Sequence, residues 1–82
     1  MRVEIEIAGT NHVLPAGVTV IGTGEEADIR VVRATVSRVH ARIVVEHDAV
    51  FIEDLGSKNG TFVNGKRISG KARIGHGDIL SL

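Results

Sequence analysis

Apolar residues recur at every second position in several short stretches of this chain, and this period of two constrains the fold more than any other feature. Residues 2–7, RVEIEI, place Val3, Ile5 and Ile7 on one face and charged side chains on the other. Residues 49–55 repeat the alternation, and no stretch of about 11 residues shows the period of a helix. The pattern predicts half-buried β-strands.

Turn residues and shorter apolar stretches predict the remaining strands. The stretch 38–46 is expected to bury four residues on one side: Val39, Ala41, Ile43 and Val45. Asn64-Gly65 predicts a two-residue hairpin, because a type I′ turn needs positive φ at both positions, and another turn is expected at residues 9–11. Further strands are expected at residues 12–14, 18–22, 28–32 and 78–82. With ten glycines at turn spacing, the chain is predicted to be all-β, an antiparallel β-sandwich in one domain.

Composition argues against several classes of partner. Ten basic and ten acidic side chains leave no net charge, and two phenylalanines are too few to stack on single-stranded nucleic acid. We expect no nucleic-acid partner and, without an apolar run of about 18 residues, no membrane partner. The absence of cysteine and of a secretory signal predicts a cytoplasmic setting. No cofactor or metal is expected, because no paired ligand spacing joins the four histidines, His12, His40, His47 and His76.

The stretch VIGTGEEADI, residues 20–29, matches the glycine pattern of a dinucleotide-binding loop. Such a loop needs a long helix after its glycines, whereas here a strand is expected to begin at Asp28. Glu25 and Glu26 would also repel a pyrophosphate. We therefore interpret the glycines as a tight bend from strand to loop.

Three other stretches form a more specific pattern: TVSRVHA at 35–41, DLGSKNGTFVNG at 54–65, and Gly77-Asp78. Together with VIG and ADI they resemble the forkhead-associated (FHA) domain, and the match runs from about Val18 to Leu82. The resemblance implies a sandwich of about ten to eleven short strands whose loops, at one end, read phosphothreonine peptides. It implies a phosphopeptide-recognition module in Ser/Thr kinase signalling or transcriptional regulation of the bacterial type, and no catalysis.

Phosphothreonine carries a charge of about −1.5 to −2 and three acceptor oxygens, so its site needs several converging donors. Ser37 supplies a hydroxyl, and Arg38 supplies a fork that can bind two phosphate oxygens. Lys58 adds a point charge from a second loop. Asn59 offers a donor and an acceptor to the backbone of the peptide, as the matching residue of the family does. The simpler interpretations are a turn closed by Ser37 and ordinary solvated charges at Arg38 and Lys58.

Three residues are expected to support this site rather than to touch the ligand. The histidine of the family that matches His40 orders loops by hydrogen bonding, and Gly22 and Gly60 are the expected structural glycines. Asn64 and Gly65 are interpreted as turn residues, and Asp78 is expected to brace the turn before it. Selectivity is expected from Thr35 and from residues 66–70.

The chain departs from the family at Thr23, where an arginine normally grips the phosphate. Losing such a charged group typically costs about 1.5 to 3 kcal/mol, or roughly ten- to a hundredfold in affinity. Thr23 retains a hydroxyl donor, and Arg33, close in sequence to Ser37, is expected to compensate. The alternative function is an FHA-like scaffold that binds a partner without phosphate.

Ser37, His40 and Asp54 are also the ingredients of a nucleophilic triad, which would indicate an enzyme. The chain lacks a Gly-x-Ser-x-Gly elbow, and a sandwich of this size has little room for a substrate cleft. We therefore expect no enzymatic activity.

The family usually continues beyond a position matching Leu82 with one more strand, which lies beside the first strand. Without it, residues 2–7 would form an unpaired edge, which invites pairing with another chain. We therefore expect residues 1–82 to form a single FHA domain, a piece of a larger protein, with marginal stability or edge-to-edge self-association.

Overall fold

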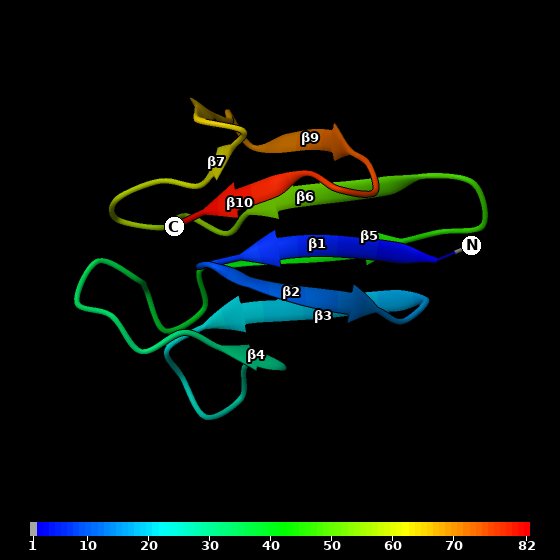
Figure 1. Ribbon diagram of the computed structural model, residues 1–82. Helices are drawn as coiled ribbons and strands as arrows, with labels where there is room; N and C mark the ends of the chain where they lie inside the picture. The colour runs from blue at the N-terminus through cyan, green and yellow to red at the C-terminus, as the bar shows by residue number, and fades with distance from the viewer. Residues whose placement is uncertain (1) are drawn as a thin grey trace.

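Two β-sheets packed face to face form the computed structural model, which describes residues 2–82 (Figure 1). One sheet has the order β2-β1-β10-β7-β8 and the other β4-β3-β5-β6-β9. The strands of the first sheet are β1 (Val3–Ile7), β2 (Thr10–Leu14), β7 (Phe62–Val63), β8 (Lys66–Arg67) and β10 (Ile79–Ser81). Those of the second are β3 (Gly17–Gly22), β4 (Ile29–Arg30), β5 (Ala41–Val45), β6 (Val50–Asp54) and β9 (Lys71–Ile74). The predicted all-β sandwich is confirmed, and residues 2–82 contain no helix long and apolar enough to cross a membrane.

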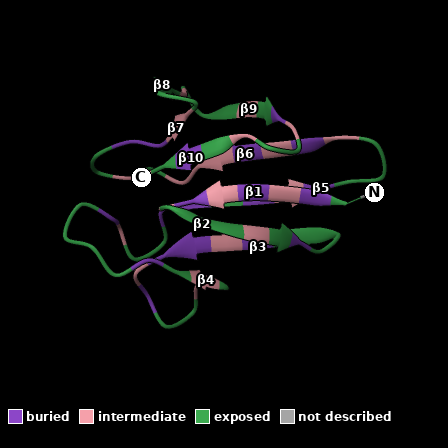
Figure 2. Ribbon diagram, in the orientation of Figure 1, coloured by how far each residue is buried: buried purple, intermediate pink, exposed green. Residues whose placement is uncertain are grey.

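The alternating residues of the sequence fill the space between the two sheets. Ile5 in β1, Ile43 in β5 and Ile52 in β6 have no exposed surface, whereas their neighbours along each strand face outward. Buried segments therefore alternate with partly exposed ones along the central strands in Figure 2. Burial of aliphatic side chains is the main stabilising contribution, at about 25 cal/mol per Å² of apolar surface.

The predicted unpaired edge at residues 2–7 is wrong, because β1 lies between β2 and β10. The backbone N–H of Glu6 donates to the carbonyl of Asp78 (3.1 Å), and the N–H of Gly77 donates to the carbonyl of Glu4 (2.8 Å). The closing strand beside β1 is thus β10, within the chain itself. The expected self-association through this edge therefore has no structural basis.

The strand pairing differs from a wholly antiparallel arrangement in two places. β10 runs parallel to β1, and β4 runs parallel to β3, so both sheets are mixed. β9 was not predicted at all, although it pairs with β6 over four residues.

The first turn is formed by Ala8 and Gly9, both with positive φ, so that residues 10 and 11 already belong to β2. Val39 is 38% exposed and precedes β5, contrary to its predicted burial.

Truncation of Ile43 tests the packing between the sheets. This side chain is fully buried between Thr19 of β3 and Ile52 of β6, its neighbours across the ladder. We expect Ile43→Ala to lower the free energy of unfolding by about 2 to 5 kcal/mol in a urea titration. The control Val32→Ala, at a loop position that is 75% exposed, is expected to stay within about 0.5 kcal/mol of the unmodified protein. Equal effects of the two substitutions would contradict this description of the core.

Candidate functional site

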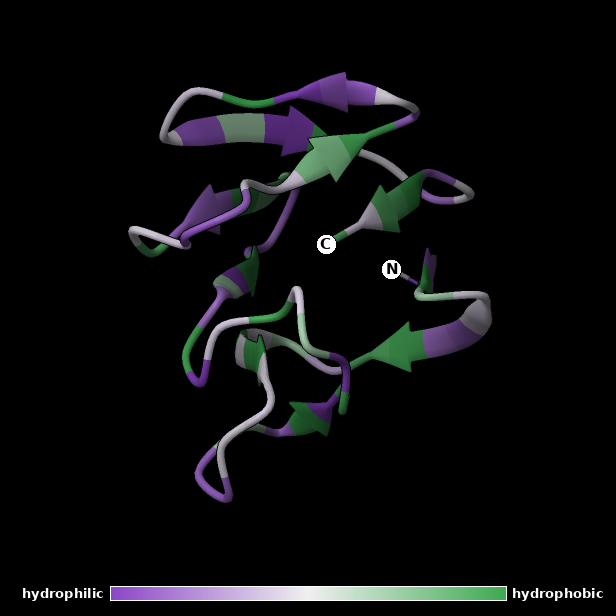
Figure 3. Cartoon of the chain, turned by 90° about the vertical axis from the view of Figure 1, so that its left-hand side faces the viewer, coloured by the Kyte–Doolittle hydropathy of each residue, from purple (hydrophilic) through white to green (hydrophobic). Residues whose placement is uncertain are grey.

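The register of the second sheet brings three chain segments to one end of the sandwich. Ile21 pairs with Ala41, and Ala41 pairs with Asp54. The end of β3, the start of β5 and the end of β6 therefore lie side by side in one row across the sheet. The segments that leave this row are residues 22–28, 31–40 and 55–61. Figure 1 shows the last two as loops on the left, and Figure 3 looks directly onto this end, which we call the loop end.

The first two segments are held together by backbone hydrogen bonds that extend the ladder beyond the strands. The N–H of Thr23 donates to the carbonyl of Ser37 (3.0 Å), and the N–H of Gly24 donates to that of Arg38 (3.0 Å). This close approach requires glycine at position 22, because a methyl group there would lie 2.0 Å from the carbonyl oxygen of Arg38. Gly22 therefore positions the segment that carries Ser37.

His40 joins the second segment to the third from a fully buried position. Its Nδ1 accepts a hydrogen bond from the backbone N–H of Ser37 (3.0 Å), and its Nε2 lies 2.8 Å from the carbonyl oxygen of Gly60. Since an N–H can only donate and a carbonyl can only accept, these partners assign the proton to Nε2. One neutral imidazole ring thus provides a hydrogen-bond partner for a backbone group of each loop.

Asp54 organises the third segment. Its carboxylate accepts hydrogen bonds from the hydroxyls of Ser57 and Thr61 and from the backbone N–H groups of Gly56 and Ser57. Burial raises the pKa of the Asp54 carboxyl, but the hydrogen bonds from Ser57 and Thr61 outweigh this effect and hold the pKa below its ordinary value of 3.8. Ser57 Oγ also accepts from the N–H of Gly60 (3.0 Å), which completes a closed turn beneath Lys58 and Asn59.

Three of the predicted ligand-binding residues meet where the loops touch. Ser37 Oγ accepts a hydrogen bond from the backbone N–H of Lys58 (3.2 Å), and Asn59 Nδ2 donates to the carbonyl of Thr35 (2.9 Å). Ser37 is partly buried, whereas the side chains of Lys58 and Asn59 are exposed. Among residues 2–82 no acceptor binds the Ser37 hydroxyl proton and no donor binds Asn59 Oδ1. Both atoms therefore remain available to a ligand.

The arginines of the loop end take different partners. Arg38, predicted to bind the phosphate, is largely exposed and lies 3.7 Å from the carboxylate of Glu26. Arg33, predicted to compensate for Thr23, extends instead to the carbonyl of Ala8 at 3.4 Å, in the turn between β1 and β2.

Arg30 is a residue that sequence reasoning missed. Its Nε donates to the carbonyl of Thr23 at 2.8 Å, so its guanidinium lies against the position where the family carries arginine. The available signal was its place in the predicted strand at 28–32, one residue after Ile29, which points its exposed side chain away from the core.

The ingredients of a nucleophilic triad are not assembled. Nδ1 of His40 binds the backbone N–H of Ser37 rather than its hydroxyl, and Nε2 faces the carbonyl of Gly60. The carboxylate of Asp54 binds Ser57 and Thr61 and forms no hydrogen bond with His40. The histidine therefore cannot act as a general base for Ser37 in this arrangement.

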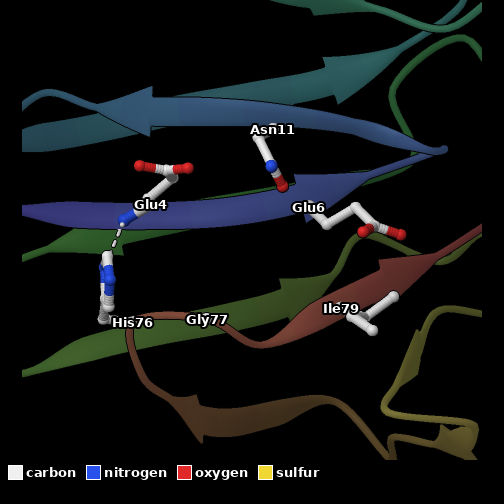
Figure 4. A pocket seen from close by; sticks show the side chains of 6 residues that line it. All are labelled: Glu4, Glu6, Asn11, His76, Gly77 and Ile79. Atoms are coloured by element: carbon white, nitrogen blue, oxygen red, sulfur yellow. Dashed lines mark hydrogen bonds between the residues drawn. The ribbon is translucent and has the colours of Figure 1, made fainter.

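A cavity of about 260 Å³ lies away from the loop end, beside β1 and the segment that precedes β10. Figure 4 shows its lining, in which Nδ1 of His76 accepts a hydrogen bond from the N–H of Glu4 at 3.1 Å. Between residues 2 and 82, no three histidine or carboxylate side chains are grouped so that they could hold a metal ion. The donors and cations described above belong to the loops, not to this cavity.

These features define a β-sandwich that presents hydrogen-bond donors and cations on two interlocked loops. The family model of the FHA domain matches residues 19–82, so the chain belongs to the FHA family. As an FHA domain it is a non-catalytic binding module.

Relatives and solved structures agree with this assignment. The glycogen accumulation regulator GarA of Mycobacterium tuberculosis is 35% identical over 92% of this chain, which spans 46% of the length of GarA. The FHA domain of the CT664 protein from Chlamydia trachomatis is 31% identical and superimposes with a TM-score of 0.88 over all of this chain and 89% of that one. Mycobacterium tuberculosis EmbR, solved in complex with a low-affinity phosphopeptide, is 36% identical with a TM-score of 0.83 over 92% of this chain and 20% of EmbR.

A substitution at Gly22 tests the close approach of the two loops. We expect Gly22→Ala to lower the free energy of unfolding by about 1 to 3 kcal/mol, because the added methyl group meets backbone atoms rather than a movable side chain. The matched control is Gly75→Ala, since Gly75 has no positive φ and no atom within 4 Å of the added methyl. The control is expected to leave stability unchanged or to raise it by up to about 1 kcal/mol. Chemical denaturation of both variants measures the difference, and a harmless Gly22→Ala would disprove the contact.

The pH dependence of stability tests the network around Asp54. Because the pKa of Asp54 is lower in the folded state than the ordinary 3.8, its carboxylate stabilises the fold fully above that value. The stabilisation is lost as the pH falls from 3.8 through the lower folded-state pKa. We expect Asp54→Asn to be destabilised at pH 7 by about 1 to 3 kcal/mol and to show a shallower pH dependence below pH 4.

The control for Asp54 is Asp48→Asn, which alters an exposed carboxylate in the turn between β5 and β6. Urea titrations between pH 3 and pH 7 supply the measurement. An acid transition that is unchanged in Asp54→Asn would exclude Asp54 as its source.

Proposed function

We propose that this domain binds phosphothreonine peptides at its loop end. The observation that carries the proposal is the hydrogen-bonded contact of the two loops, which holds Ser37 beside Lys58 and Asn59. The two loops in contact then offer a hydroxyl from Ser37, a carboxamide from Asn59 and the exposed ammonium group of Lys58, and recognition of a phosphate with several acceptor oxygens requires several such donors. Asn59 Oδ1 accepts from the backbone of the peptide and sets its register.

The comparisons support a ligand of this kind. EmbR was solved with a phosphopeptide, and another FHA domain, 32% identical with a TM-score of 0.78, has phosphothreonine-dependent interactions. By analogy we place this domain in bacterial-type Ser/Thr kinase signalling or transcriptional control, in the cytoplasm. Its partner is a protein phosphorylated on threonine.

Thr23 makes the proposed site weak and sensitive to salt. Without an arginine at this position, the remaining cations act from exposed side chains, where ionic screening is effective. Arg38 must also exchange Glu26 for the phosphate, and this exchange reduces the net gain. Arg30, held at the carbonyl of Thr23, adds positive charge next to the altered position.

A second candidate function is a contact that does not depend on phosphate. Two observations favour it: Thr23 replaces the phosphate-gripping arginine of the family, and Glu26 already pairs with Arg38. In that case, the same loops would bind an unphosphorylated partner. The two functions differ in whether removing the phosphate from a peptide abolishes its binding.

Substitution of the proposed phosphate ligands distinguishes these functions. We expect Ser37→Ala and Arg38→Ala each to weaken binding of a phosphothreonine peptide by about ten- to a hundredfold, because each removes a hydrogen bond to a charged group. Isothermal titration calorimetry at low and high salt supplies the affinities, with the unphosphorylated peptide as reference. Arg73→Ala is the matched control, since it removes one exposed charge from β9, outside the loop end.

Phosphate-dependent binding that is unaffected by Arg38→Ala and by Ser37→Ala would place the ligand elsewhere on the domain. Equal binding of phosphorylated and unphosphorylated peptides would instead establish the second candidate function.

A further inference from the structure

Arg67, in β8, reaches the loop that carries Lys58 and Asn59. A methyl group placed on Gly60 would lie 2.6 Å from Nε of Arg67 and 2.9 Å from its Cζ. The guanidinium therefore lies directly over the Cα atom of Gly60, which has a positive φ of 93°. Glycine at position 60 serves the turn and also provides space for the arginine.

The backbone beneath Arg67 is among the most firmly held parts of the loop end. The carbonyl of Gly60 accepts from His40, and its N–H donates to Ser57 Oγ. Gly60 also directly follows Asn59, the residue proposed to bind the backbone of the peptide. The charged end of Arg67 is thus placed beside the proposed peptide path by a rigid support.

Arg67 also forms no ion pair within the part of the chain that the structure describes. No carboxylate of residues 2–82 lies within ion-pair distance of it, whereas Arg2, Arg38 and Arg42 each pair with a glutamate. The residue is exposed, and its guanidinium forms no hydrogen bond with the side chains or backbone of residues 2–82. A guanidinium with unused donors matches the geometry of a carboxylate, which it binds through two parallel hydrogen bonds.

We propose that Arg67 forms a second subsite, which binds the carboxylate of an aspartate or glutamate in the phosphopeptide. The inference rests on the proposed function and names a narrower ligand class, an acidic phosphothreonine peptide. An extended peptide advances about 3.3 Å per residue, so the acidic residue lies within a few positions of the phosphothreonine. Ser37 and Lys58 engage the phosphate, and Arg67 engages the carboxylate.

A peptide series with a single movable glutamate tests this subsite. The parent peptide carries phosphothreonine among alanine and glycine residues, and glutamate is placed at each of about four positions on either side. We expect glutamate at one position to raise affinity by about three- to tenfold in the unmodified domain, within the range of exposed and bidentate charge pairs. Arg67→Ala and Arg67→Gln should both abolish this preference while retaining phosphate-dependent binding.

Lys66→Ala is the matched control. Lys66 also lies in β8 and carries the same charge, but side chains alternate along a strand, so it points to the other face. We expect Lys66→Ala to keep the preference for glutamate, which separates a local subsite from general electrostatic attraction. Arg67→Gln retains most of the side chain over Gly60, so loss of preference in a folded Arg67→Gln domain excludes a collapse of the loop.

Three results would overturn the subsite. The first is phosphate-dependent binding without a preference for glutamate at any position, and the second is a preference that survives both substitutions of Arg67. Either of these leaves the proposed function intact. The third is the absence of phosphate-dependent binding throughout the series, which would overturn the proposed function as well.

Discussion

The loop end depends on one buried imidazole ring. His40 accepts a hydrogen bond from the N–H of Ser37 and donates one to the carbonyl of Gly60. One rigid, uncharged side chain therefore links two loops that are distant in sequence. Without it, the buried carbonyl of Gly60 and the partly buried N–H of Ser37 would lose their partners, and a buried group without a partner costs about 1 to 3 kcal/mol. The ring is buried beneath the site and does not form part of its surface, and it fixes the positions of Ser37 and Lys58 relative to each other. Preorganisation of this kind reduces the entropy cost of binding a flexible peptide.

The strand and core positions could be predicted because alternation is a local property. Val3, Ile5 and Ile7 face inward, as their period of two requires. The position of β1 between β2 and β10 could not be predicted in the same way, because it depends on residues more than seventy positions apart. β10 is three residues long and parallel to β1, and neither property leaves a distinct mark on the sequence. Val39 follows the alternation of β5 but lies two residues before this strand begins, where the chain has not yet entered the sheet.

In the candidate site, too, some features could be predicted from the sequence and others could not. The spacing of Ser37, His40 and Asn59 matched a family pattern, and the structure connects all three through backbone groups of adjoining loops. The prediction for Arg33 rests on its nearness to Ser37 in the sequence, whereas its side chain donates to the carbonyl of Ala8. Neither the contact of Arg30 with the carbonyl of Thr23 nor the pairing of Arg38 with Glu26 follows from spacing in the sequence. The acceptor that an exposed arginine binds depends on which groups lie nearby in the folded structure, and spacing in the sequence does not determine it.

Amide chemical-shift mapping of the isotope-labelled domain tests directly whether the loop end binds phosphothreonine. The domain is titrated with pooled phosphothreonine peptides, beside phosphoserine and unphosphorylated pools, at low and high salt. We expect shifts that require phosphothreonine, that fade with salt and that centre on four residues: Ser37, Arg38, Lys58 and Asn59. Shifts that are independent of phosphate, or that centre on the sheet faces, would contradict a phosphothreonine site at the loop end.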